Sequence, residues 1–266
     1  AGNDLVSGEY NVLLGYRAGT DTTGSRNLYL GKDAALFNVS GDYNIALGTL
    51  SLRGTEGSAN GSCNIGIGRY TGRSTTTGNH NVLLGDCAGF GITTAAETIA
   101  LGKEVFTTCG LTGEQNIGLG CRVGCKMTSG TQNIMLGSRV MANDVVTGGY
   151  NIALGYHVLL DATSASCNIA MGRQAGQNIT TGAQNIFLGS NAGDADNDGN
   201  YQIFIGCGAG LYMQGDTNIG LGFQALRGST TASNNSGTDN VAIGMYAGQS
   251  NTSGTQNILL GRQAGN

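Results

Sequence analysis

The sequence contains no proline and no tryptophan, and only 11% of its 266 residues are charged. The absence of proline excludes a collagen triple helix, which needs proline as well as glycine at every third position. The low charge excludes a chain kept disordered by charge repulsion. The net charge of −4 argues against nucleic acid as a partner, because binding a phosphate backbone requires a basic face.

Histidine and long apolar runs are also scarce. The two histidines, His80 and His157, are far apart in the sequence, so we expect no histidine-based catalytic or metal cluster and no enzymatic activity. No apolar run is long enough to cross a bilayer as a helix, and we expect no membrane insertion. The seven cysteines are too few for a disulfide-stapled scaffold. We interpret them mainly as small buried side chains, with interchain disulfides and metal binding as alternatives.

What the chain has in excess is glycine, with 48 residues, and this glycine follows a repeat. The pattern Asn-Ile-x-Leu-Gly occurs fifteen times, mostly 16 to 18 residues apart, with two longer spacings of 20 and 22 residues. Glycine in a helix interior costs about 1 kcal/mol relative to alanine, which excludes an ordinary helical domain. A fixed period over the whole chain indicates a repeat architecture instead.

Each unit is too short to hold a helix and a strand, and Ile-x-Leu alternates as a strand does. We therefore predict an all-β parallel β-solenoid of about fifteen coils of ~17 residues, forming a single repetitive domain over residues 1–266. We expect two short strands per coil: Ile-x-Leu, and a second one near the small residue three places after the glycine. Four consecutive coils carry valine at that small position.

Asparagine and glycine recur at fixed places because like residues stack on like in successive coils. The side-chain amide of asparagine is suited to hydrogen bonding its neighbours above and below, as a ladder. Glycine marks a backbone position with positive φ or without room for a Cβ. The predicted ladder consists of Asn11, Asn27, Asn44, Asn64, Asn81, Asn116, Asn133, Asn151, Asn168, Asn185, Asn218, Asn240 and Asn257. The predicted glycine column consists of Gly15, Gly31, Gly48, Gly68, Gly85, Gly102, Gly120, Gly137, Gly155, Gly172, Gly189, Gly206, Gly222, Gly244 and Gly261.

The middle residue of the Ile-x-Leu strand is never charged, whereas an exposed strand face is normally polar. We therefore expect both strand faces to be buried, one inside the coil and one against another chain. On this argument, lysine in place of Leu83 and Leu259 dissociates the assembly or prevents its folding.

Segments such as Tyr-Asn-Ile-Ala-Leu-Gly from Tyr150 and Asn-Ile-Phe-Leu-Gly-Ser-Asn-Ala-Gly from Asn185 resemble repeats of bacteriophage tail-fibre proteins. They are also similar to the head repeats of trimeric autotransporter adhesins, although the coil is longer here. The resemblance covers essentially the whole chain. It implies a left-handed parallel β-roll in an intertwined or side-by-side homotrimer, on a virion surface or outside the cell.

The function expected from the repeats and the resemblance is that of a structural fibre or adhesin segment. Such a segment acts as a stiff shaft and attaches to a host receptor, either a cell-surface glycan or a protein. Because the chain starts and stops within repeats, we expect it to be part of a longer fibre. The alternative is a monomeric ice-binding or mineral-binding β-solenoid, suggested by Thr-Thr-Gly segments such as the one at Thr76.

The two longer spacings predict polar loops on an otherwise regular scaffold, residues 53–62 and 227–239. Such loops tolerate insertion and often carry recognition, with a passive surface bulge as the alternative. The receptor-contact candidates are Arg53, Glu56, Asn60, Arg227, Asn234, Asn235 and Asp239.

One candidate metal site lies in the eleventh coil, where Asp194, Asp196 and Asp198 precede Gly199. The pattern matches the opening of a calcium loop, but its twelfth position is Ile205 where a bidentate glutamate belongs. A helix–loop–helix calcium site is therefore excluded, and a solenoid turn would have to supply the missing oxygen ligands. The alternative is three solvated aspartates on a turn. We expect no other cofactor.

Overall fold

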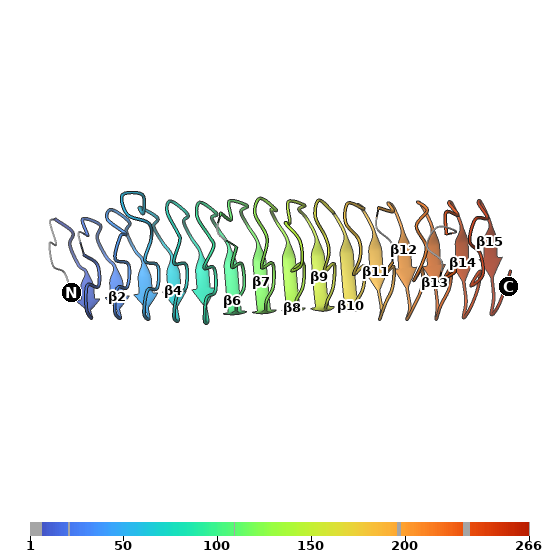
Figure 1. Ribbon diagram of the computed structural model, residues 1–266, viewed down its shortest axis with the longest axis horizontal. Helices are drawn as coiled ribbons and strands as arrows, with labels where there is room; N and C mark the ends of the chain where they lie inside the picture. Colours follow the sequence, from blue (N-terminus) through green and yellow to red (C-terminus); the bar gives the residue numbers. More distant parts are fainter. Residues whose placement is uncertain (1–6, 21, 109, 196–197, 231–234, 266) are drawn as a thin grey trace. The chain divides into compact units, whose positions relative to one another are not determined.

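The computed structural model describes residues 7–20, 22–108, 110–195, 198–230 and 235–265. The chain divides into two compact units, Ala1–Gln132 and Asn133–Asn266. Both are all-β, and the fold is a parallel β-solenoid of about 14 turns with coils of about 17 residues, as the repeat predicts. Figure 1 shows the strands of each unit side by side in chain order. No helix in the described ranges has the length and apolar character needed to cross a membrane.

The strands come from the Ile-x-Leu segments. Those of the first unit are β1 (Val12–Leu14), β2 (Leu28–Leu30), β3 (Ile45–Leu47), β4 (Ile65–Ile67), β5 (Val82–Leu84), β6 (Ile99–Lys103) and β7 (Ile117–Cys121). Those of the second are β8 (Ile134–Ser138), β9 (Ile152–Tyr156), β10 (Ile169–Arg173), β11 (Ile186–Leu188), β12 (Ile203–Ile205), β13 (Ile219–Leu221), β14 (Val241–Ile243) and β15 (Ile258–Leu260). Within each unit consecutive strands pair in parallel and in register, so that Leu83 lies opposite Ala100.

Each coil has one strand among the described residues, so the prediction of a second strand is wrong. The small residue after the glycine lies instead in a buried turn, as Val105 and Val123 do. Left-handed residues interrupt the extended backbone there, for example Cys87 (φ 59°) and Gly89 (φ 63°). The turn still bonds to its neighbour, since the N–H of Gly89 donates to the carbonyl of Val105 at 2.8 Å.

The core of each coil contains the middle residue of the strand. Tyr29, Leu83, Phe187 and Phe204 are fully buried there. Leu83, where lysine is predicted from the sequence to dissociate the assembly or prevent its folding, lies inside its own coil and not at an outward surface. The face that points outward carries the first and third strand residues.

In several coils, core filling follows a reciprocal rule between the middle residue and the residue four places after the strand glycine. Phe187 is large and glycine follows at Gly193, where a Cβ would lie 2.5 Å from the Phe187 ring. Ala153 is small and Leu159 follows, and both are fully buried. The coil with Ala170 and Gly176 has two small residues, so the two positions exchange core volume only in some coils.

The invariant strand glycine is required by both conformation and space. Gly31 has φ 137°, and a Cβ added to it would lie 2.6 Å from the carbonyl oxygen of Gly48 in the next coil. The glycine column therefore permits the coils to stack at close distance.

Candidate functional site

The largest unusual surface is the outward face of the strands. In both units its first and third positions are aliphatic in every strand, and none of these side chains is buried. Leu84 is 38% exposed and Leu136 is 46% exposed. We call these two columns of side chains the aliphatic face of each unit. Since a soluble monomer usually keeps such a face polar, this surface is a candidate for contact with another molecule.

Charged residues flank the aliphatic face and pair between neighbouring coils. Arg69 Nε lies 2.9 Å from Asp86 Oδ1, and Arg122 Nε lies 2.8 Å from Glu104 Oε2. The hydrogen bond from the Arg69 guanidinium lowers the pKa of the Asp86 carboxyl. These pairs are open to solvent, so salt screens them and they add little stability.

Behind the face, the asparagine column bonds successive coils as its recurrence predicts. The Nδ2 of Asn44 donates to the carbonyl of Gly61 at 2.9 Å, and its Oδ1 accepts the N–H of Asn64 at 2.9 Å. The same pair of bonds recurs at Asn168 and Asn185, whose side chains are fully buried. The column therefore has a structural role, because its side chains join each coil to the next.

The first lengthened coil leaves the regular path after Arg53. The Arg53 guanidinium stacks over the Phe37 ring, 4.6 Å from its centre. Glu56 and Asn60 are exposed, and Ala59 between them is buried in a bridge to Asn38. The three candidate residues thus lie on one loop, with Arg53 held at its base.

The second lengthened coil begins in the same way. The Arg227 guanidinium stacks over the Tyr212 ring at 5.4 Å from its centre. Asp239 is exposed and accepts a hydrogen bond from Thr217, while Asn234 lies outside the described residues.

Asn235 is buried, which corrects its assignment as a receptor contact. Its Oδ1 accepts the N–H of Ser229 at 2.7 Å, and its Nδ2 donates to the Ser229 carbonyl at 2.8 Å. The side chain therefore closes the base of the loop.

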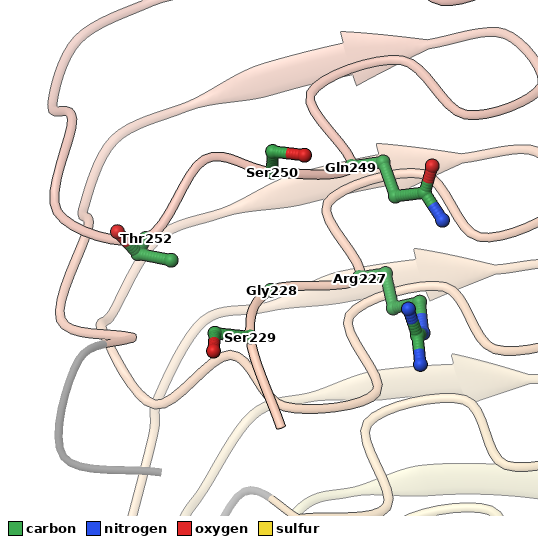
Figure 2. A pocket seen from close by; sticks show the side chains of 6 residues that line it. All are labelled: Arg227, Gly228, Ser229, Gln249, Ser250 and Thr252. Carbon is green, nitrogen blue, oxygen red and sulfur yellow. The ribbon is translucent and has the colours of Figure 1, made fainter. Parts of the chain in front are cut away.

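A pocket of about 390 Å³ lies beside this second lengthened coil. Its lining consists of Arg227, Gly228, Ser229, Gln249, Ser250 and Thr252. Figure 2 shows Arg227 and Gln249 on one side of the pocket, with Ser229 and Thr252 on the other. Of these residues, only Arg227 is among the receptor-contact candidates predicted from the sequence. The residues around 250 were not predicted, although they occupy the coil that follows the spacing of 22 residues and that spacing could have identified them.

The candidate calcium residues are not brought together among the described residues. Asp194 accepts a hydrogen bond from Asn191 at 2.9 Å, and its burial raises its pKa. Asp198 instead accepts bonds from the hydroxyls of Thr180 and Thr181. Asp196 lies outside the described residues, and the described part of the chain has no cluster of three metal-ligating side chains. The calcium site stays a prediction.

The threonines behind the ice-binding alternative bond within the solenoid. The hydroxyls of Thr23, Thr76 and Thr93 each donate to a carbonyl of the next coil at 3.1 Å. Thr22 is fully buried. Each of these three hydroxyls therefore uses its donor within the solenoid, and the ice-binding alternative stays a prediction.

The cysteines differ from the interpretation as buried side chains. Cys121, Cys167 and Cys207 are exposed, and the other described cysteines are half-buried. All six are free thiols in the single chain. Burial raises the pKa of the Cys125 thiol, which makes it less reactive. The three exposed thiols are the ones that a reagent in solution can reach. Cys109 lies outside the described residues.

No protein-family description and no curated protein matches this sequence. The functional argument therefore depends on the aliphatic face, the loops and the pocket.

Proposed function

We propose that this chain is a structural segment of a surface fibre, in which copies pack their aliphatic faces together as a homotrimer. The proposed assembly is a left-handed β-roll on a virion or cell surface, with the lengthened coils available for host attachment. The single observation that carries the proposal is the uncharged aliphatic face on both units.

The size of the face supports association. At about 4.8 Å per strand, the seven strands of the first unit extend the face over about 30 Å, and the second unit has one strand more. Monomeric soluble proteins rarely expose continuous apolar patches above a few hundred Å². Covering such a strip with the equivalent strip of another copy removes it from water, at roughly 25 cal/mol for each Å² buried.

The composition of the face supports a copy of the same chain as the occupant. Every coil presents two apolar side chains of similar size at the same two positions, so the face of each unit has translational repetition along the stack. A second copy has the same repeat distance, and its side chains therefore meet the face in register over its full length. Three copies around an axis bury the face without leaving an open edge.

The test is the mass of the purified protein in solution by light scattering. We expect three times the 27.0 kDa of one chain. Leu136→Lys, on the outward face of β8, should release monomers because it places an unpaired charge in the interface. A stable wild-type monomer contradicts the proposal, and thermal hysteresis in that monomer would support the ice-binding alternative.

The matched control is Ser138→Lys in the same strand. The register places Ser138 opposite Tyr156, and Tyr156 opposite Arg173, so this column of the second unit already holds a cation. The solenoid accommodates a cation in that column, so Ser138→Lys should stay trimeric. Equal dissociation by both variants would show that added charge, and not the aliphatic face, controls the mass.

A further inference from the structure

We propose that the pocket beside the second lengthened coil binds a carboxylated sugar, with the carboxylate on Arg227. The inference rests on the attachment role proposed above, and it names the ligand class and the site. It follows from how the insertion opens the pocket, from the state of the arginine and from the character of the lining.

The insertion creates the pocket by separating two neighbouring coils. The N–H of Gly228 donates to the carbonyl of Gln249, and the N–H of Gly237 donates to that of Thr252. The chain between the two glycines is therefore much longer than the chain opposite, between Gln249 and Thr252. The pocket lies at this difference in length, and its lining comes from Arg227–Ser229 of one coil and from residues 249, 250 and 252 of the next.

The arginine in this pocket is held in place without an acidic partner. Arg17, Arg69 and Arg122 each pair with a carboxylate of a neighbouring coil, whereas no salt bridge among the described residues involves Arg227. Its Nε is buried and has no hydrogen-bond partner in the described part of the chain, which is also true of Arg73 Nε. A ligand carboxylate would therefore bind the terminal N–H groups of the Arg227 guanidinium.

The position of the guanidinium is fixed in advance. It stacks on the Tyr212 ring, and the Arg227 carbonyl accepts the N–H of Tyr212 at 2.8 Å. Stacking restricts the side chain and leaves its planar fork available for two parallel bonds to a carboxylate. The neighbouring Gln249 is also held, since its Nε2 donates to Gln224 at 2.9 Å.

The rest of the lining suits a ligand with many hydroxyl groups. Apart from Gly228 it consists of three hydroxyl side chains and one amide, with no apolar side chain. Such groups both donate and accept hydrogen bonds. The volume of about 390 Å³ lies within the range of small-ligand clefts, about 300–1,000 Å³. A polar cleft of this size with one cation fits a pyranose that bears a carboxylate.

The test is a saturation-transfer NMR titration of the full chain. The probes are methyl β-D-glucuronide and the methyl glycoside of N-acetylneuraminate, with methyl β-D-glucoside and acetate as controls. We expect at least one carboxylated glycoside to bind at least about tenfold more tightly than the neutral glucoside and acetate, since it alone combines the charge with the ring. Equal binding of the glucoside, equal binding of acetate, or no binding of either carboxylated glycoside overturns the proposal.

Two variants localise the binding. Arg227→Gln removes the charge and suits the fold, because Gln177 and Gln249 occupy the same coil position. It should weaken binding at least about tenfold. Ser250→Phe fills the pocket at an exposed position and should abolish binding with Arg227 in place. Wild-type affinity in either variant overturns the assignment.

Arg26→Gln is the matched control. Arg26 also stacks on aromatic rings, between Tyr10 and Tyr43, but lies in the other unit. Its coil position holds glutamine at Gln115 and Gln132, so the change is accommodated and binding should stay within about twofold. Equal weakening by Arg26→Gln overturns the site.

Light scattering on the same samples separates this inference from the proposed assembly. A trimer that binds neither carboxylated glycoside overturns the pocket alone. A monomer that binds one through Arg227 overturns the assembly alone.

Discussion

The two faces of each strand differ strongly in solvent exposure, although their residues are similar in chemistry. In β5, Leu83 and Leu84 are adjacent and identical in chemistry, but Leu83 is fully buried and Leu84 is 38% exposed. The inward face varies from glycine to phenylalanine, whereas the outward face is aliphatic in every strand. The variable face is thus the solenoid core, where volume is shared with another position, and the uniform face is a repeated surface.

The largest expected effect comes from lysine on the two faces of β5. Leu83→Lys buries an unpaired charge and should destabilise the coil by at least about 3–5 kcal/mol. Leu84→Lys should change the stability of the single chain by less than about 1 kcal/mol while disrupting the trimer. Chemical denaturation and light scattering on both variants measure the two effects. Similar unfolding midpoints for the two variants would contradict the assignment of the faces.

The reciprocal core rule predicts a rescue in β11. Phe187→Ala alone should cost about 3–5 kcal/mol through the cavity it leaves. Adding Gly193→Leu should recover a large part of this loss, because it reproduces the natural pair Ala153 and Leu159 of another coil. Leucine tolerates the left-handed conformation at that position, as Leu159 shows with φ 47°. A double variant no more stable than Phe187→Ala in thermal melts would contradict the rule.

A smaller effect is expected behind the strands, in the asparagine column. Asn151→Ala removes the side-chain bond to the Ala165 carbonyl and the one accepted from the Asn168 N–H, both fully buried. We expect a loss of about 1–3 kcal/mol in the free energy of unfolding. The comparison is Asn143→Ala, whose side chain bonds to Asp161 at an exposed site and should matter by less than about 0.5 kcal/mol. Equal losses would show that the column does not contribute through burial.

The smallest effect is the pH dependence expected from Asp194. Burial raises the pKa of this carboxyl, so the folded state keeps its proton to higher pH than the unfolded state. Stability should therefore fall as pH rises from the ordinary carboxyl range to the raised pKa, and Asp194→Asn should remove that slope. Thermal melts across acidic to neutral pH measure it. A fall of stability with rising pH that is equal or steeper in Asp194→Asn would contradict the prediction.

Several features were predictable from local pattern. The repeat of Asn-Ile-x-Leu-Gly predicts parallel strands in register, and the recurrence of asparagine predicts the bond that the Asn64 N–H donates to Asn44 Oδ1.

The burial of single residues in the lengthened coils depends on the tertiary structure. Asn235 has the composition of a surface loop residue, but it is buried at the base of its loop against Ser229. The two lengthened coils begin alike, with Leu-Arg-Gly followed by a hydroxyl residue, and differ in the residue that closes each loop. Composition does not distinguish these outcomes.

The sequence by itself determined the period, the parallel stacking and the asparagine and glycine columns. Each of these depends on a residue meeting the same residue one coil away, so recurrence in the chain is sufficient to specify it. Only the tertiary structure decided which strand face is inside. The alternating pattern is apolar on both faces, and the packing volume inside the coil selects one of them. The tertiary structure also decided the pocket, because its lining residues come from two coils that are separate in the sequence and adjacent only in the stack.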